Sequence, residues 1–302
     1  MGNEQNKAIL RRWLDEGWCK GNVDVADELI STDFTVHGAG GQAIQSGRQG
    51  VKDLVLEWRR GFPDGQMRVL DELGEGDLVG VRLLWTGTHL GPFYGVPPSG
   101  RRVTCVSLGI DRIQDGRISE GWGELDMLGL MQRINGVPGA ASRARPDRGL
   151  EEPTQTWATL SSASANKALV RRVLQSIEDG DLDAIREACD VDSYVEHVPG
   201  QGTLLLDEAL RADSLLRASL PDLTFTLDEG RMVAEGDRVL VRGTFSGTHT
   251  GAPLLDAPPS GKELLWGGID IFRVSAGRLT ERWRCSDTLR LMQQAGAAVL
   301  KT

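Results

Sequence analysis

The sequence has few of the residues that build disulfide, metal or nucleic-acid sites. It contains four cysteines and four histidines in 302 residues, and the cysteines form no Cys-x-x-Cys pair. We therefore expect neither a disulfide framework nor a zinc site, and we interpret the cysteines as buried free thiols. The net charge of −9 argues against nucleic acid as a partner, because phosphate binding needs clustered lysine and arginine.

Other signatures are missing as well. The sequence has no Gly-x-Ser-x-Gly elbow, which leaves a serine nucleophile unsupported, and no two histidines at the helical spacing of metal ligands. Its first residues, Met-Gly-Asn-Glu-Gln-Asn, combine no basic segment with an apolar one and carry no myristoylation signal. We therefore expect a cytoplasmic protein that does not bind a membrane.

The most informative feature that the sequence does contain is a long internal repeat. Asn6-Lys-Ala-Ile-Leu-Arg-Arg-Trp-Leu14 returns as Asn166-Lys-Ala-Leu-Val-Arg-Arg-Val-Leu174. Further segments return in the same order, namely Gly87-Thr-His89 as Gly247-Thr-His249, Pro97-Pro-Ser-Gly100 as Pro258-Pro-Ser-Gly261, Gly109-Ile-Asp111 as Gly268-Ile-Asp270, and Trp122 to Asp126 as Trp283 to Asp287. Units of this length are domains rather than solenoid turns. The sequence predicts one domain over residues 1–135, a linker over 136–165 and a second domain over 166–302.

Each repeat changes from helical to alternating periodicity along its length. Ile9 and Trp13, like Leu169 and Val173, stand four residues apart, which predicts an opening helix with one apolar face. Two shorter helices are expected to follow in each repeat, around residues 24–30 and 51–60, and around 182–189 and 207–218. Residues 77–89 and 237–249 then alternate as strands, and two more strands follow across a hairpin turn. The predicted fold is α+β, with three helices packed on a curved, mainly antiparallel sheet.

The last strand of each repeat carries carboxylates on a face that we expect to point inward. This face holds Ile118, Glu120, Trp122, Glu124 and Asp126 in the first repeat, and Leu279, Glu281, Trp283, Cys285 and Asp287 in the second. An inward carboxylate is costly without partners, so such residues are either paired or line a pocket in which a raised pKa is useful. We interpret Glu120 and Glu281 as partners of arginine.

Two pairs of aspartates are candidate catalytic groups. Asp126 and Asp287 end the last strand directly before apolar pairs, where a helix cap explains them equally well. Asp111 and Asp270 lie on the preceding strand. Each could be a general base whose pKa is raised by a second carboxylate, or the cross-strand partner of an arginine.

Histidines and aromatic residues complete the set of candidate site residues. His37 and His197 stand at equivalent places and are candidate acid/base groups, whereas the other histidine pair, His89 and His249, fits a turn or a sheet edge. The side chains expected to contact a substrate are Trp85, Trp122, Phe245, Trp266 and Trp283, with Glu124 beside them.

The order of these motifs resembles a known family. In each repeat an opening helix is followed by the motifs His37 or His197, Phe62-Pro-Asp64 or Leu220-Pro-Asp222, Gly-Thr-His with Gly91 or Gly251, Pro-Pro-Ser-Gly, Asp-Gly-Arg-Ile118 or Ala-Gly-Arg-Leu279, and Glu-x-Trp with its aspartate. This order is similar to that of the SnoaL-like polyketide cyclases, which belong to the nuclear-transport-factor-like superfamily of cone-shaped α+β barrels. The resemblance covers nearly all of each repeat.

The resemblance implies cofactor-free cyclisation of a hydrophobic, polyketide-like small molecule by intramolecular aldol chemistry. It gives the role of general acid/base to Asp126 and Asp287, with His37 and His197 as candidate donors to the enolate. Neither a cofactor nor a metal is expected. The resemblance also implies that the two domains pair as a pseudo-dimer, with further homo-oligomerisation left open.

The repeats differ from each other, and the fold hosts other functions. Phe93-Tyr-Gly-Val96 is replaced by the longer Pro253-Leu-Leu-Asp-Ala257, and Cys285 stands where Glu124 does, so one domain could catalyse while the other supports it. An epoxide hydrolase or epoxide-opening ether cyclase is the first alternative, although the strand expected to carry its Arg-x-Asp reads Leu83-Leu-Trp85. The second is a non-catalytic binding or scaffolding pseudo-dimer.

Overall fold

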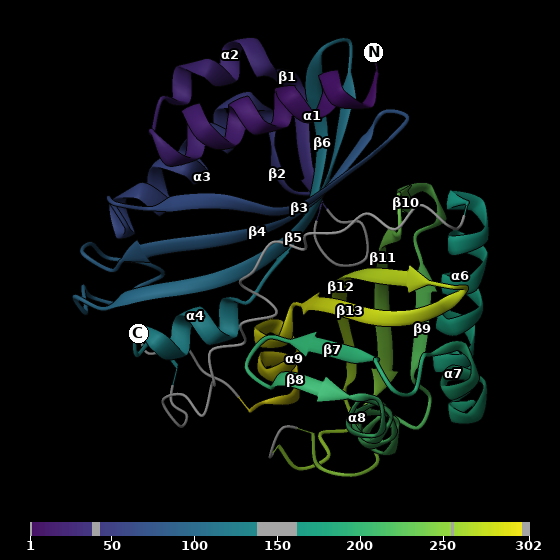
Figure 1. Cartoon of the computed structure of the whole chain (residues 1–302). Coiled ribbons are helices and arrows are strands. Elements are labelled where there is room, and N and C mark those ends of the chain that lie inside the picture. Colours follow the sequence, from purple (N-terminus) through teal and green to yellow (C-terminus); the bar gives the residue numbers. More distant parts are fainter. Residues whose placement is uncertain (1, 38–42, 138–161, 255–256, 298–302) are drawn as a thin grey trace. The chain divides into compact units, whose positions relative to one another are not determined.

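A computed structural model describes residues 2–37, 43–137, 162–254 and 257–297 of the chain. These residues form two compact units, which we call unit one (residues 2–137) and unit two (residues 162–297). Each unit contains helices and its own sheet (Figure 1). Most of the predicted linker, residues 138–161, lies outside the described part of the chain.

Unit one begins with helices, as its apolar periodicity predicts. Its helical segments are α1 (Asn3–Arg12), the π-helical η1 (Trp13–Cys19), the 3-10 turn η2 (Val23–Val25), α2 (Ala26–Leu29), α3 (Gly47–Gly61) and α4 (Met127–Arg133). Leu10, Trp13 and Leu14 are buried, because they share one face of the first helical run. Helices α1, α2 and α3 lie on the same side of the sheet (Figure 1).

The sheet of unit one has six strands in the order β2-β1-β6-β5-β4-β3. Their bounds are β1 (Ile30–His37), β2 (Ala43–Ser46), β3 (Gln66–Glu75), β4 (Leu78–Thr88), β5 (Arg102–Gln114) and β6 (Arg117–Leu125). All neighbouring pairs are antiparallel except β1 with β6. The first long strand and the hairpin that follows it are therefore where the alternating pattern predicts them.

Unit two repeats this arrangement with local changes. Its helical segments are α6 (Ala163–Asp179), α7 (Leu182–Ala188), α8 (Leu206–Ser219), the 3-10 turn η4 (Glu229–Arg231) and α9 (Thr288–Ala295). Its strands are β7 (Val195–Val198), β8 (Gly202–Leu205), β9 (Thr224–Leu227), β10 (Val233–Glu235), β11 (Arg238–Thr248), β12 (Glu263–Ser275) and β13 (Arg278–Ser286). The sheet order is β10-β11-β12-β13-β7-β8, and β9 also pairs with β11. The single strand β3 of unit one thus corresponds to two short strands.

Each unit has its own hydrophobic core between its helices and its sheet. In unit one the core joins Leu10 and Trp13 to Val55 on α3 and to Val79 and Val81 on β4. In unit two the matching core is built from side chains of α6, α8, β11 and β12, among them Val170, Leu210, Val241 and Phe272. Both predicted α+β domains therefore have the cores that they need to fold. None of the four cysteines forms a disulfide bond, and Cys105, Cys189 and Cys285 are buried, as predicted, whereas Cys19 is only half-buried.

Candidate active site

Unit one encloses a cavity of about 340 Å³ between its first helices, α3 and the strands of its sheet. Most of the lining is apolar, and much of it is aromatic, including Trp13, Trp18, Trp58 and Trp85. Polar side chains are few. They are Tyr94, Ser107, Asp111 and Glu124. An apolar cavity with a few polar groups is the usual form of a small-molecule site.

Asp111 is the carboxyl group that faces this cavity from β5. It pairs in register with Gly121 on β6, and a Cβ atom at that glycine would lie 3.1 Å from Asp111 Oδ1. The glycine therefore makes room for the carboxyl group. Burial raises the pKa of Asp111 from 3.8 to about 7. A second carboxylate, which the sequence analysis invoked, is not the cause.

The strand register corrects the predicted inward face of the last strand. Residues opposite each other in an antiparallel pair point to the same face, so Gly121 shares the cavity face with Asp111, while Trp122 shares the other face with Ile110. The Trp122 ring stacks on His37, with ring centroids 5.0 Å apart. Residues Trp122 and Glu124 border the cavity, but the alternation turns the Trp122 side chain away from Asp111.

The register also shows that Asp111 and Asp270 are not equivalent. Trp122 pairs with Ile110, and its counterpart Trp283 pairs with Ile271. The residue after Ile271 is Phe272, which therefore takes the place of Asp111. Asp270 lies two positions earlier on the same face, because it pairs with β11 as Gly109 pairs with β4. Matching the two repeats by their Gly-Ile-Asp motif therefore pairs residues that are not structurally equivalent. Matching them by the hairpin turn that follows pairs the equivalent residues.

In unit two, the region that corresponds to the cavity around Asp111 contains charged side chains that form ion pairs. We call Glu196, Asp213, Asp270, Arg282 and Arg284 the charge network. Arg282 Nη2 lies 2.7 Å from Asp270 Oδ2, and Arg284 Nη1 lies 3.0 Å from Glu196 Oε1. These two arginines occupy the places of Gly121 and Gly123 in unit one, so side chains fill space that unit one leaves open. Asp270 is thus the partner of an arginine, the alternative that the sequence analysis had left open.

Asp126 and Asp287 both cap helices. Asp126 Oδ1 accepts a hydrogen bond of 2.9 Å from the backbone N–H of Gly129 at the start of α4. Asp287 Oδ1 accepts the matching bond of 3.1 Å from Arg290 at the start of α9. Burial raises the pKa of both carboxyl groups. Neither residue lines the cavities described for the two units.

The cap geometry predicts a modest and matched loss of stability. Replacing Asp126 or Asp287 by alanine removes the acceptor and should lower the free energy of unfolding by about 1 kcal/mol in each case. Asp126→Asn should keep both stability and turnover, because asparagine caps a helix as well as aspartate does. Urea denaturation and an activity assay test this. Loss of turnover in a normally stable Asp126→Asn protein would instead restore Asp126 as the catalytic group.

The remaining predicted residues lie at three places. His197 stacks on Trp283, with centroids 5.6 Å apart, and its Nε2 lies 2.9 Å from Glu281 Oε1. Neither this histidine nor His37 lines the described cavities. Phe245 borders a cavity of unit two and stacks on Trp266 at 5.2 Å. Trp85 lines the cavity of unit one, and its contact with a substrate stays a prediction.

Several site residues were not predicted. Ser107 and Tyr94 border the cavity of unit one, and Asp213, Arg282 and Arg284 belong to the charge network of unit two. For the two arginines, the signal in the sequence is the contrast between the repeats, because two glycines in the last strand of one repeat are replaced by two arginines in the other.

Within the described residues, no group of three or more His, Cys, Asp or Glu side chains could hold a metal ion. The described part of the chain also has no helix long and apolar enough to span a membrane.

Comparison with known proteins places both repeats in one family profile. The profile of SnoaL-like polyketide cyclases matches residues 8–134 and 167–295. No curated protein matches the chain. Among solved structures, a candidate SnoaL-like polyketide cyclase from Jannaschia sp. CCS1 is 32% identical and aligns over 45% of this chain and 95% of its own, with a TM-score of 0.42.

Two further solved structures are similar over one repeat length. AclR from Streptomyces galilaeus, a candidate hydroxylase, is 26% identical over 45% of this chain and 100% of its own, with a TM-score of 0.42. IdmH from Streptomyces antibioticus, a candidate polyketide cyclase, is 26% identical over 43% of this chain and 98% of its own, with a TM-score of 0.39.

Proposed function

The chain belongs to the family of SnoaL-like polyketide cyclases, and from this premise we propose that unit one closes a ring in a polyketide-like substrate by general acid/base catalysis. The observation that carries the proposal is Asp111, a carboxyl group with a pKa near 7 at the wall of an apolar cavity. A base works best when its pKa lies near the working pH. Asp111 meets this requirement without a cofactor.

The proposed reaction is an intramolecular aldol addition. Asp111 takes the proton from a carbon that lies between two carbonyl groups, and the electron pair of that C–H bond becomes an enolate. The enolate carbon then forms a bond to a second carbonyl carbon of the same molecule. The oxygen of that carbonyl group takes the proton back from Asp111. The carboxylate is therefore regenerated, and the apolar wall keeps water from competing for the proton.

The other polar groups of the cavity would orient the substrate. Ser107 and Asp111 lie on the same face of β5, four residues apart, which places them about 13 Å from each other along the strand. Ser107 can therefore hydrogen-bond a distant oxygen of a multi-ring substrate, while Asp111 meets the reacting carbon. Tyr94, at the edge of the cavity, offers a further hydroxyl donor.

We assign the acid/base role to unit one alone. In unit two the place of Asp111 is taken by Phe272, and Asp270 is held by Arg282 at 2.7 Å. An oxygen of Asp270 already accepts a hydrogen bond from this guanidinium, so it is not open to a substrate proton as the Asp111 carboxyl group is. Unit two would therefore support or regulate unit one rather than repeat its chemistry.

A pair of alanine substitutions tests the proposed base. A Cβ atom at Gly121 would meet Asp111 Oδ1 at 3.1 Å, whereas at Gly123 the nearest atom would be Leu108 O at 3.9 Å. Gly121→Ala should therefore displace the carboxyl group and slow proton abstraction by about tenfold or more, since small misplacements are costly in catalysis. Gly123→Ala should have little effect.

The assay follows the exchange of the acidic C–H proton of aromatic β-keto esters in D2O by NMR, in the full chain. Exchange that is slowed by Gly121→Ala but not by Gly123→Ala supports Asp111 as the base. Equal rates in both variants and the parent protein, or no exchange above the buffer rate, would contradict the proposal.

We also propose that the two domains pair within one chain, as the resemblance implies. Expressing residues 1–135 and 166–302 separately and mixing them tests this idea by size-exclusion chromatography. Association of the two fragments supports pairing. If each fragment stays monomeric alone and in the mixture, the pairing idea fails.

A further inference from the structure

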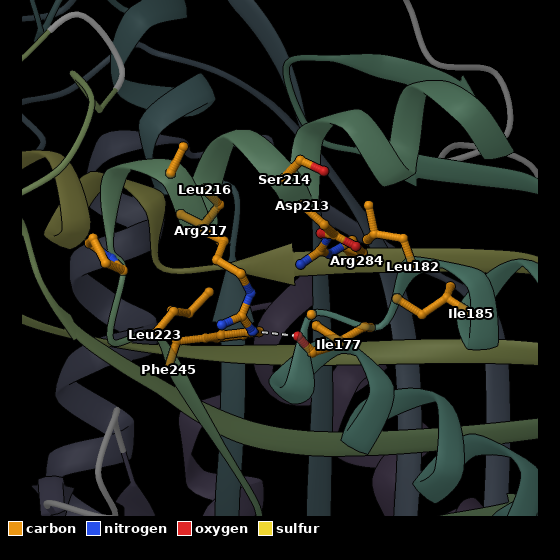
Figure 2. A pocket seen from close by; sticks show the side chains of 13 residues that line it. Ile177, Leu182, Ile185, Asp213, Ser214, Leu216, Arg217, Leu223, Phe245 and Arg284 are labelled. Atoms are coloured by element: carbon orange, nitrogen blue, oxygen red, sulfur yellow. Dashed lines mark hydrogen bonds and ion pairs between the residues drawn. The ribbon is translucent and has the colours of Figure 1, made fainter.

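Unit two has a cavity of its own, with a volume of about 430 Å³. Its walls are mainly apolar and come from α6, α7, α8 and the sheet, with Ile177, Ile185, Leu216, Leu223 and Phe245 among them. The side chains of Asp213 and Arg284 lie beside each other within this ring of apolar residues (Figure 2). A donor and an acid thus stand together in an otherwise hydrophobic site.

These two residues are the part of the charge network that is open to the cavity. The side chains of Asp213 and Arg284 are 15% and 16% exposed, against 2% for Glu196 and 6% for Asp270. Arg284 Nη1 donates hydrogen bonds to both Glu196 Oε1, at 3.0 Å, and Asp213 Oδ1, at 3.4 Å. Arg284 Nε also lies 3.7 Å from Asp270 Oδ1. The atoms left for a ligand to contact are the second terminal nitrogen of Arg284, Nη2, and the second carboxyl oxygen of Asp213, Oδ2.

The pair is specific to unit two. Gly91 donates its N–H to Gly61, and Gly251 donates its N–H to Ser219, which aligns the ends of α3 and α8. Counting back along the helices, Val55 stands at the place of Asp213, and Trp58 at the place of Leu216. On the sheet, Gly123 stands at the place of Arg284. The Asp213–Arg284 pair therefore depends on differences between the units in both the helix, α8 against α3, and the strand, β13 against β6.

The charges at the cavity favour an anion over a cation. Two guanidinium groups border it, those of Arg217 and Arg284, against one carboxyl group, that of Asp213. Arg217 Nη2 donates to the backbone oxygen of Ile177 at 2.6 Å (Figure 2), so it is fixed at the rim. Burial raises the pKa of Asp213, which favours the protonated form that can donate to an anion.

We propose that this cavity is a second ligand site, which binds an apolar molecule by its carboxylate group. Arg284 Nη2 donates to one carboxylate oxygen, and Asp213 donates to the other when its carboxyl group carries a proton. The hydrophobic body of the ligand packs against Leu216 and Phe245. Binding makes and breaks no covalent bond. The site does not depend on the catalytic role of unit one.

The experiment uses isothermal titration calorimetry on the full chain, with 4-phenylbutanoate as the probe and 4-phenylbutylamine as its cationic counterpart. Leu216→Trp restores the large side chain that unit one carries at this place and should fill the cavity. Leu215→Trp is the matched control, because Leu215 is 63% exposed on the same helix. We expect the acid to bind the parent protein and Leu215→Trp equally, and at least tenfold more weakly to Leu216→Trp.

The proton on Asp213 gives a second readout, which a merely steric effect would not produce. The charged groups that act on Asp213 are Arg284 and Arg282 on β13 and Glu196 on β7. Arg217 on its own helix borders the same cavity, and Tyr194 donates to Glu196 Oε2 at 3.0 Å. Binding of the acid should weaken as the pH rises, since Asp213 must be protonated to donate. Asp213→Asn donates at every pH and should remove this dependence.

Three results would overturn the proposal. The first is undiminished binding to Leu216→Trp, which would place the probe elsewhere. The second is equal affinity for the amine, which would contradict the charge argument. The third is no binding of the acid to the parent protein at millimolar concentration.

Discussion

Asp111→Asn should abolish most of the turnover while making the protein more stable. The substitution removes the base but keeps the shape of the side chain, and loss of a general base costs about 10²–10⁴-fold in rate. Asp115→Asn is the matched control. It lies in the hairpin turn after β5 at φ 49°, a conformation that asparagine also adopts. We expect this control to leave the rate unchanged.

The gain in stability has a definite pH dependence. Asp111 has a pKa of about 7 in the folded protein against 3.8 ordinarily, so the unfolded chain ionises first as the pH rises. Folding is therefore progressively disfavoured between these two values, and the full cost, up to about 4 kcal/mol, is present above the folded-state pKa. Asparagine does not ionise. The variant should thus match the parent protein at about pH 3.5 and exceed its stability most at about pH 8.

Urea denaturation at these two pH values, together with a turnover assay, checks the prediction. A variant that loses turnover and gains stability only at the higher pH fits a buried catalytic carboxyl group. An Asp111→Asn protein that turns over substrate at the parent rate would contradict the assigned role. A loss of stability at about pH 8 would contradict the burial of the charge.

Arg282→Met should destabilise unit two strongly. Arg282 is almost fully buried, with its Nη2 at 2.7 Å from Asp270 and its guanidinium carbon 4.9 Å from the centre of the Phe272 ring. Removing one partner of a buried ion pair leaves the other charge uncompensated, which costs about 3–5 kcal/mol. Arg171→Met is the matched control. It removes an exposed pair with Glu229 at 2.9 Å and should cost less than about 1 kcal/mol.

A double variant separates the pairing effect from the loss of packing. In the Arg282→Met background Asp270 keeps only the longer ion pair with Arg284 Nε, at 3.7 Å. Replacing Asp270 by leucine removes this poorly paired carboxylate and should recover a large part of the lost stability. The measurement is the unfolding transition of unit two in urea. Similar losses in Arg282→Met and Arg171→Met, or no recovery in the double variant, would show that the charge network is not the source of stability.

The sequence alone predicted the repeat, the α+β fold and the family. The profile match confirms the family resemblance, and the helices near residues 51–60 and 207–218 form where the periodicity placed them. These features depend on local periodicity and on motif order, which a chain displays directly. The helix caps at Asp126 and Asp287 were also among the predicted alternatives, because a cap is a local interaction.

The inward face of the last strand was predicted correctly at Ile118 and Leu279, which lie in the two cores, but wrongly for the residues that follow, and the reason is physical. Alternation separates two faces but identifies the inward one only if the other face is exposed. Here Trp122 is 2% exposed and Ile110 fully buried, so hydrophobicity marks the face opposite to Asp111. The cavity face of β6 carries Gly121 and Gly123 beside Leu125, and glycines carry no hydrophobic signal. Only the strand register could show that their lack of side chains leaves room for the carboxyl group.

The two repeats thus use one fold in opposite ways. Unit one keeps Gly121 and Gly123 beside the Asp111 carboxyl group, whereas unit two fills the same places with Arg282 and Arg284 and adds carboxylates to match them. Burial raises the pKa of Asp111, whereas the carboxylates of unit two have arginine partners. The presence of two glycines or two arginines at these places therefore decides whether the unit presents a candidate base or a candidate ligand site.

The central claim is that Asp111 titrates near neutrality inside an apolar cavity, and carboxyl ¹³C NMR measures this most directly. The protein would be labelled at its aspartate carboxyl carbons, and the signal of Asp111 would be identified by its absence from the Asp111→Asn spectrum. We predict a titration midpoint near pH 7 for this signal, as its pKa of about 7 requires. A midpoint close to 3.8, the ordinary value, would contradict the account.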